Sequence, residues 1–234
     1  MKKGCRYSSA FLIYEKVINM EKKSVTELGN PAKPHGSAGE EMLMGMNEHH
    51  SPVTEWALGF LDVKSGDTVL DIGCGGGAAI KRIAQTTEAS LIFGIDHSEL
   101  SVKLSTINNA GSIECGKVRI KEASVDALPF ENESFDRIVT VESFYFWPDP
   151  AQNLKEVYRV LKKGGRFLIA ADIHGDAVLD EKDIDGIRKF NLYNPTPAEF
   201  KNLLENAGFI NVVIHTKDGE KWVCAEGNKL NLPL

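Results

Sequence analysis

The sequence predicts an α/β fold built on a seven-stranded, mostly parallel sheet with helices on both faces. Short apolar runs alternate with helix-length segments between about residues 68 and 173, which is typical of parallel strands joined by helices. The first run, residues 68–72, ends abruptly in glycines, as a buried parallel strand does at a tight turn. The chain closes with a helix and two strands around Asp218 and Gly219, which predicts an antiparallel last strand.

The domain plan follows from length and local composition. A chain of 234 residues is long enough for one domain with a sizeable core, which we assign to residues 30–234. Residues 1–29 are expected to form a loosely attached N-terminal extension. Residues 30–62 are expected to form a helical N-terminal cap, in which Ser51 is the N-cap of a helix and Pro52 its first residue.

The remaining elements are assigned in chain order from periodicity and capping residues. After the first strand, further strands are expected at residues 90–96, 118–122, 134–141, 166–173, 209–216 and 220–226. Helices are expected at residues 78–85 and 98–108, after an Asp149 cap up to Gly164, and from a capping box at Thr196 to Gly208. Residues 174–195 are charged and are expected to be an irregular insertion bordering the substrate side.

The turn after the first strand is the predicted ligand site. Its glycines allow positive φ angles and a close approach of the backbone to a ligand, and the next helix points free N–H groups into the same space. Two nucleotide sites fit this turn. Gly73, Gly75 and Ala78 satisfy the dinucleotide fingerprint, with Asp96 as the ribose ligand. Asp71 argues against a pyrophosphate, whose charge has the same sign, and favours a ligand with positive groups.

A set of motifs in order resembles class I S-adenosylmethionine-dependent methyltransferases, in particular the ubiquinone/menaquinone-biosynthesis-like branch that acts on small molecules. The motifs are the series Asp71-x-Gly73-x-Gly75-x-Gly77, the acidic Asp96, the turn Leu128-Pro129-Phe130, and the run LKEVYRVLKKGGRF at residues 154–167. The resemblance covers roughly residues 68–172. It implies a Rossmann-like fold, S-adenosylmethionine as cofactor, and methyl transfer to a small-molecule acceptor, whose methylated atom stays open among oxygen, nitrogen, carbon and sulfur.

The same resemblance implies the cofactor contacts. Gly73, Gly75 and Gly77 would hold the methionine and ribose part, Asp71 would lie near the ammonium group, and Asp96 would bind the ribose. His97, Ser124, Val125 and Glu142 complete the predicted cofactor-binding residues. Ser124 stands where the family has an aspartate that takes the adenine amino group, so its hydroxyl and the N–H of Val125 are the expected base contacts. Asp126 is expected to cap a turn.

Two residues are candidates for catalysis. His50, in the loop before the Ser51 helix, is the candidate base for an acceptor that must lose a proton. Tyr145 lies in a run of four aromatic residues after the fourth strand, where open α/β sheets bind ligands, and is the candidate for orienting the acceptor. The alternatives are a solvated His50 and a Tyr145 that only packs in the core.

Composition limits the other possibilities. With 27 basic and 33 acidic residues the net charge is -6, which disfavours a nucleic-acid partner. Four widely spaced cysteines and the lack of a metal-ligand spacing predict a cytoplasmic protein without a metal site, and no apolar run is long enough to span a membrane. An NAD(P)-dependent oxidoreductase, a regulatory module without catalysis, and a methyltransferase acting on protein or nucleic acid remain alternatives.

Overall fold

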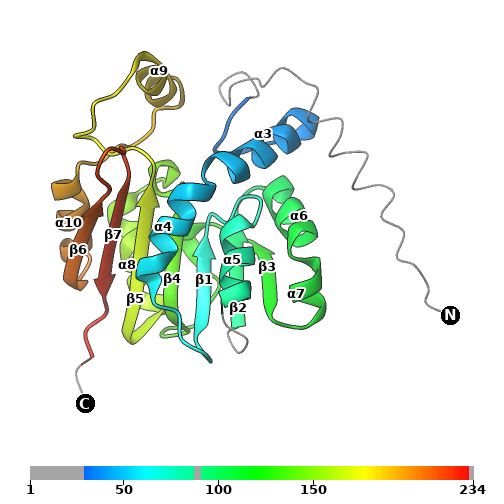
Figure 1. The fold of residues 1–234 in the computed structure, drawn as a ribbon. Helices are drawn as coiled ribbons and strands as arrows, with labels where there is room; N and C mark the ends of the chain where they lie inside the picture. The colour runs from blue at the N-terminus through cyan, green and yellow to red at the C-terminus, as the bar shows by residue number, and fades with distance from the viewer. Residues whose placement is uncertain (1–28, 87–90, 232–234) are drawn as a thin grey trace.

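The computed structural model describes residues 29–86 and 91–231, and its centre is a seven-stranded sheet (Figure 1). The strand order is β3-β2-β1-β4-β5-β7-β6. The strands are β1 (Thr68–Ile72), β2 (Leu91–Asp96), β3 (Val118–Glu122), β4 (Phe135–Val141), β5 (Leu161–Ala171), β6 (Ile210–Thr216) and β7 (Val223–Asn228). β7 runs antiparallel to both β5 and β6, whereas β1 to β5 pair in parallel. The predicted fold class, including the antiparallel last strand, is confirmed.

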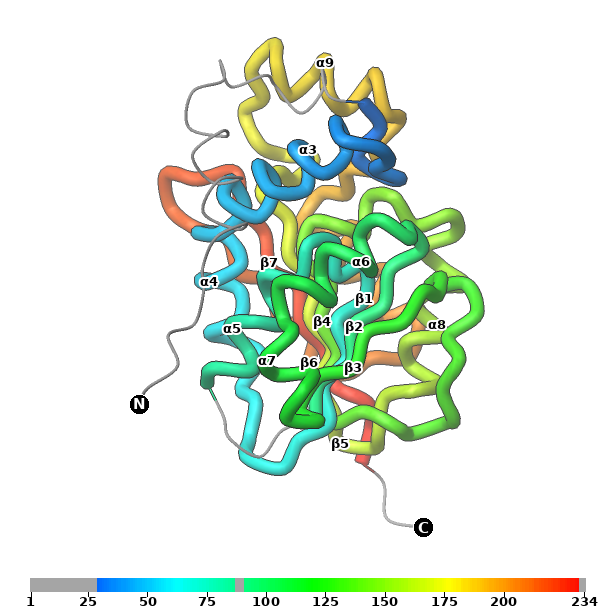
Figure 2. The backbone as a smooth tube through the Cα atoms, turned by 90° about the vertical axis from the view of Figure 1, so that its right-hand side faces the viewer, coloured from blue at the N-terminus to red at the C-terminus, as the bar shows by residue number. Residues whose placement is uncertain are grey.

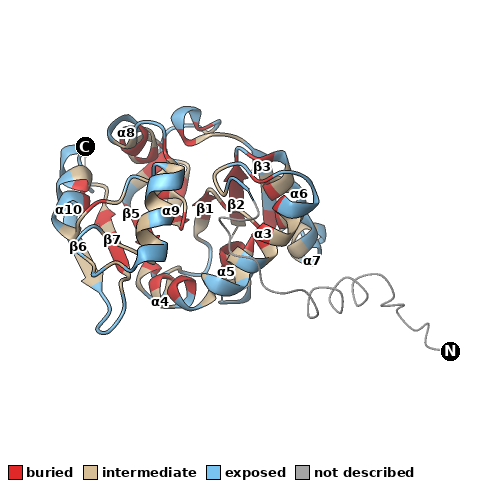
Figure 3. Cartoon of the chain, turned by 90° about the horizontal axis from the view of Figure 1, so that it is seen from above, coloured by how far each residue is buried: buried red, intermediate tan, exposed pale blue. Residues whose placement is uncertain are grey.

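Helices cover both faces of the sheet. α4 (Ser51–Leu61), α5 (Ala78–Thr86), α6 (Glu99–Asn108) and the short α7 (Ala110–Glu114) lie on one face, and α8 (Pro150–Val160) and α10 (Pro197–Asn206) lie on the other (Figure 3). Two apolar cores result, because one face of each helix is buried on the sheet. One contains Leu61 and Ile80, and the other contains Leu154 and Phe200.

Two further helices lie above the carboxyl ends of the parallel strands. They are α3 (Gly36–His49) and α9 (Glu181–Phe190), as both views of the chain show (Figures 1 and 2). Between strands and helices, two 3₁₀ turns follow β3 and β4, namely η1 (Val125–Ala127) and η2 (Phe144–Phe146). This arrangement places irregular backbone and two helices around the edge where open α/β sheets bind ligands.

Most local sequence signals are confirmed at the helix ends. Asp149 caps α8 by accepting a hydrogen bond from the Gln152 N–H, and Thr196 and Glu199 form the reciprocal capping box of α10. α8 ends at Val160 rather than at Gly164, because β5 already begins at Leu161 and pairs with β4 there.

Two predictions for the cap and the insertion are wrong. Ser51 is the first residue of α4, not its N-cap; His50 holds that position, and the Ser51 hydroxyl accepts a hydrogen bond from Arg82 instead. Residues 174–195 are not wholly irregular, because they contain α9, which starts with a capping box formed by Asp180 and Asp183. The predicted extension, residues 1–29, lies outside the described residues except for Gly29. Within the described part of the chain, none of the helices has the length and apolar character needed to cross a membrane.

Candidate active site

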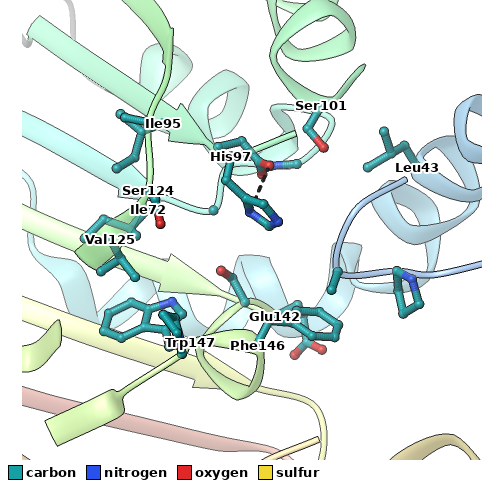
Figure 4. A pocket seen from close by; sticks show the side chains of 18 of the residues that line it. Leu43, Ile72, Ile95, His97, Ser101, Ser124, Val125, Glu142, Phe146 and Trp147 are labelled. Atoms are coloured by element: carbon teal, nitrogen blue, oxygen red, sulfur yellow. Dashed lines mark hydrogen bonds and ion pairs between the residues drawn. The ribbon is translucent and has the colours of Figure 1, made fainter. Parts of the chain in front are cut away.

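The site lies at the carboxyl ends of β1, β2 and β4, in a cavity of about 300 Å³. Figure 4 shows side chains from several elements converging on it. Leu43 from α3 and Ser101 from α6 lie on one side, and Ile72, Val125 and Trp147 lie on the other. A second cavity of about 70 Å³ adjoins it, since Leu43, Met46, Gly73, Gly75 and Glu142 line both.

The glycine-rich loop forms the floor that connects the two cavities. The N–H groups of Gly73 and Cys74 both donate to the Ile95 carbonyl, at 2.8 and 2.9 Å, which ties the loop to β2. Gly73 has φ of 72°, and a Cβ at this position would lie 1.9 Å from the Ser143 Oγ. Only glycine therefore fits between β1 and the segment after β4, and the backbone itself faces the cavity.

Gly77, an expected cofactor contact, packs against α6. It does not line either cavity; a Cβ there would meet the Ser105 Oγ at 2.4 Å, and its carbonyl accepts a hydrogen bond of 3.1 Å from the Asn109 side chain. Gly77 thus lets the loop pack against α6, behind the site. The neighbouring Cys74 is also buried, with its thiol 3.7 Å from the Ser105 hydroxyl.

Asp96 ends β2 with both carboxylate oxygens held by backbone N–H groups. Oδ2 accepts from Gly75 and Oδ1 accepts from Ser98, each at 2.9 Å. Burial raises the pKa of Asp96, and these two hydrogen bonds oppose the shift. Each oxygen retains a lone pair for a further donor, so the carboxylate is suited to a pair of hydroxyl groups. His97 follows, with its Nδ1 3.9 Å from the Asp96 Oδ1, and its ring projects into the cavity (Figure 4).

Asp71 is the most unusual group in the site. It lines the smaller cavity, is only 1% exposed, and its Oδ2 has no hydrogen-bond partner among the described residues. Burial, helped by the nearby Asp96, raises the pKa of Asp71 to about 7. An unpaired buried carboxylate is costly, and a ligand with a positive group at this position would remove that cost. The site therefore fits a cofactor that carries an ammonium group.

The end of the larger cavity that is formed by Ser124, Val125 and Trp147 is mostly apolar. Ser124 and Val125, the expected base contacts, line it, whereas Asp126 is exposed and belongs to η1 outside the lining. Trp147 was not predicted individually. It lines the same end, is 6% exposed, and its indole N–H has no acceptor among the described residues.

Glu142 lines both cavities. It follows β4 directly, has φ of 55°, and is 7% exposed. Its Oε2 accepts a hydrogen bond of 2.9 Å from the Tyr145 hydroxyl, and its Oε1 accepts one of 2.5 Å from the Asp172 N–H. Burial, followed by the charge of Asp172, raises the pKa of Glu142 well above its usual range. A non-glycine residue in the left-handed region costs energy, and such residues cluster at functional sites.

His50 lies at the junction of α3 and α4, beside these acidic residues. Its Nε2 is 3.6 Å from the Glu142 Oε2 and 3.9 Å from the Asp172 Oδ2. Burial lowers the pKa of His50 to about 4, so its imidazole is uncharged at neutral pH. The two candidate catalytic residues, His50 and Tyr145, thus both approach the Oε2 of Glu142.

Two residues of this cluster were not identified from the sequence. His49 Nε2 is 3.7 Å from the Asp172 Oδ2, and Asp172 itself follows β5 directly. Asp96 is the last residue of β2 and Asp172 directly follows β5, so an acidic residue at the carboxyl end of a strand was a signal that could have indicated Asp172.

Comparison with known proteins agrees with this geometry. A methyltransferase domain family matches residues 70–169. The uncharacterized methyltransferase YdaC of Bacillus subtilis is 26% identical over 79% of this chain and 95% of its own length. The C-methyltransferase UbiE of ubiquinone and menaquinone biosynthesis from Geotalea daltonii is 38% identical over 43% of each chain. Apart from YdaC, the chain spans about half or less of the first curated relatives that it matches.

A solved structure gives the same fold. Phosphoethanolamine N-methyltransferase 2 of Haemonchus contortus, determined with S-adenosylhomocysteine, superposes with a TM-score of 0.69 at 15% identity, over 82% of this chain and 58% of that one. At that identity the likeness concerns the fold alone. The family match and the relatives support a class I S-adenosylmethionine-dependent methyltransferase with S-adenosylmethionine as the cofactor, and the fold agrees with this.

Proposed function

We propose that this protein transfers the methyl group of S-adenosylmethionine to a small-molecule acceptor by in-line displacement. The observation that carries the proposal is Asp71, whose buried carboxylate has a free oxygen beside the glycine loop and Asp96. Asp71 would hold the ammonium group, Asp96 the ribose hydroxyls, and Ser124 and Val125 the adenine. When bound, S-adenosylmethionine supplies a methyl group on a positively charged sulfur.

The residues of the protein would align the acceptor with the methyl group and exclude water from the site. Phe146 and Trp147 line the larger cavity with aromatic surface, and α3 contributes Leu43 and Met46 to both cavities. Aromatic faces favour a cation and keep the site dry, which suits a reaction that disperses charge. Helices α3 and α9 lie above the carboxyl ends of the strands (Figure 2), and α3 lines both cavities, which supports an acceptor of small size.

His50 and Tyr145 are proposed to act on the acceptor. The uncharged imidazole of His50 has a free lone pair for a proton of the acceptor, but its lowered pKa makes it a weaker base than an ordinary histidine. Tyr145 lines neither cavity itself, and its proposed part in orienting the acceptor depends on its hydrogen bond to Glu142, which lines both. The net charge of -6 supports the absence of a nucleic-acid partner, and the free thiols of the three described cysteines support a cytoplasmic location.

The test combines binding and turnover. Calorimetry with S-adenosylhomocysteine and with NADH separates the proposed function from an oxidoreductase; binding of NADH without S-adenosylhomocysteine would refute the proposal. A panel of phenols, amines, thiols and quinols, scored by S-adenosylhomocysteine formation, then identifies the acceptor. His50→Ala should reduce turnover at least about 100-fold with cofactor affinity intact. His35→Ala, at an exposed histidine, is the control and should have normal turnover.

A further inference from the structure

Three side chains at the edge of the smaller cavity converge on one point. His49, His50 and Asp172 each offer a ligand atom, and these atoms all lie within 4.8 Å of one another. His49 is the last residue of α3, His50 connects α3 to α4, and Asp172 follows β5. The sequence could not show this cluster, because its acidic member lies far along the chain from the two histidines.

The distances suit ligands of a common ion better than hydrogen bonds. The His49 Nε2 and the His50 Nε2 are 3.7 and 3.9 Å from the same oxygen, Asp172 Oδ2, which is too long for a hydrogen bond. Two nitrogen or oxygen ligands, each about 2.1 Å from a tetrahedral ion, lie roughly 3.4 Å apart. The two histidine–aspartate separations exceed this value by only a few tenths of an ångström, and a turn of the exposed His49 side chain would complete such a site.

The charge around the cluster also favours a cation. Asp71, Asp96 and Glu142 line the two cavities, and none of the described residues that line them is a lysine or an arginine. Of these, the Glu142 carboxyl group lies nearest to the cluster, with its Oε2 3.6 Å from the His50 Nε2. Buried carboxylates without enough positive partners are costly, and a bound dication would compensate for them.

We propose that His49, His50 and Asp172 bind a transition-metal dication such as Zn²⁺ or Fe²⁺. Imidazole ligands select these ions over Mg²⁺ and Ca²⁺, which prefer oxygen ligands alone. Three protein ligands leave at least one coordination position open, as in catalytic metal sites. Here that position adjoins the smaller cavity, which His50 lines.

The metal site does not depend on the proposed methyl transfer, but the part of the ion in catalysis does. The lone pair of His50 would hold the ion, and the ion rather than the imidazole would withdraw charge from an acceptor oxygen. Glu142 would remain beside the ion and keep Asp172 in place, because it accepts a hydrogen bond from the Asp172 N–H.

The experiment uses the full chain, freed of metal with a chelator and titrated with Co²⁺ alone. We expect one Co²⁺ per chain, with d–d absorption bands and no thiolate charge-transfer band, which distinguishes this cluster from the exposed Cys115. His49→Ala and Asp172→Asn should each weaken Co²⁺ binding at least about tenfold, while His35→Ala should bind as the wild type does. The proposal is overturned if the wild type binds no stoichiometric Co²⁺, or if His49→Ala binds it normally.

His49→Ala is the decisive variant because the His49 side chain is 69% exposed, so its loss leaves the core intact. Its melting temperature and its S-adenosylhomocysteine affinity should match the wild type. If Asp172→Asn fails to fold, His49→Ala decides alone. Co²⁺ binding is measured without cofactor. Binding of S-adenosylhomocysteine without binding of Co²⁺ would therefore refute only the metal site. Binding of Co²⁺ without binding of S-adenosylhomocysteine would refute only the cofactor proposal.

Discussion

The Tyr145 hydroxyl donates a 2.9 Å hydrogen bond to the Oε2 of Glu142, a carboxylate that is almost completely buried. The two residues belong to the segment that leaves β4, and Glu142 begins it with a left-handed backbone conformation. The phenol thus satisfies one oxygen of a carboxylate, while the backbone N–H of Asp172 satisfies the other. Tyr145 is therefore a structural partner of Glu142 as well as a candidate acceptor contact.

Tyr145→Phe should destabilise the protein and disturb the acceptor side. Loss of the hydroxyl leaves a buried carboxylate oxygen without a donor, which costs about 1–3 kcal/mol of unfolding free energy. Urea unfolding measures this cost. Tyr193→Phe, at a side chain that is 41% exposed, is the matched control and should change stability by less than about 0.5 kcal/mol. Equal stability of the two variants would show that the Tyr145 hydroxyl contributes nothing to Glu142.

Asp96→Ala should weaken S-adenosylhomocysteine binding by about 1.5–3 kcal/mol, or roughly 10- to 100-fold. The variant removes the carboxylate that we assign to the ribose, and it also frees the Gly75 and Ser98 N–H groups that hold the loop. Calorimetry gives the affinity, and circular dichroism checks the fold. Asp126→Ala, at an exposed acid outside the cavity, should bind normally. An unchanged affinity in folded Asp96→Ala would exclude the ribose assignment.

Asp71 should make cofactor binding depend on pH. Its pKa in the folded protein is about 7, so the carboxylate becomes ionised, and able to pair with an ammonium group, as the pH rises through 7. S-adenosylhomocysteine affinity should therefore increase about tenfold between pH 6 and pH 8. The slope should disappear in Asp71→Asn, which cannot ionise. A wild-type slope that survives in this variant would assign the pH dependence to another group.

In the protein without ligand, the Asp71 carboxyl group should lower the free energy of unfolding as the pH rises. Its folded-state pKa is raised, so between about pH 4 and pH 7 the folded state retains a proton that the unfolded state has released. Stability then falls with increasing pH, by up to about 1.4 kcal/mol per pH unit from this group. Denaturant unfolding of the wild type and Asp71→Asn over this range gives the difference. A slope that is the same in both would contradict the assignment.

Gly73→Ala should destabilise the loop by about 2–4 kcal/mol. The new methyl group would overlap the Ser143 Oγ, and the positive φ would add strain. Gly66→Ala is the matched control, because Gly66 has φ of 90° with open space around it, and it should show the conformational cost alone. Adding Ser143→Gly to Gly73→Ala should restore part of the loss in urea unfolding. If Ser143→Gly restores no stability, the cost of Gly73→Ala comes from the backbone conformation and not from the contact with Ser143.

The sheet and the cofactor side could be predicted because each rests on a local pattern. β1 and β2 are short apolar runs, and Asp71 and Asp96 lie at their ends, so strand polarity alone places both carboxylates at one edge. The positions of Gly73 and Gly77 relative to the cavities could not be distinguished from the sequence, because the spacing of glycines does not show which side of the loop faces the ligand. Only the packing of Ser105 and Asn109 against Gly77 shows this.

The acceptor side could be predicted only in part. His50 and Tyr145 were identified individually, but their common contact with Glu142 depends on the φ angle of Glu142, which no local signal indicates. His49 and Asp172 meet only because the carboxyl-terminal end of α3 lies beside the residue that follows β5. The helix α9 was missed because its residues are mostly charged and include Gly186, although Ile184 and Ile187 have helical spacing.

The burial of Cys74 protects the glycine loop from thiol reagents. Burial raises the pKa of the Cys74 thiol well above its usual range and also raises that of Cys224, so neither forms the thiolate that oxidants and maleimides attack. Cys115, exposed after α7, is the reactive thiol among the described cysteines. A fluorescent label attached there would leave the glycine loop untouched, and mild oxidation should spare the cofactor site for the same reason.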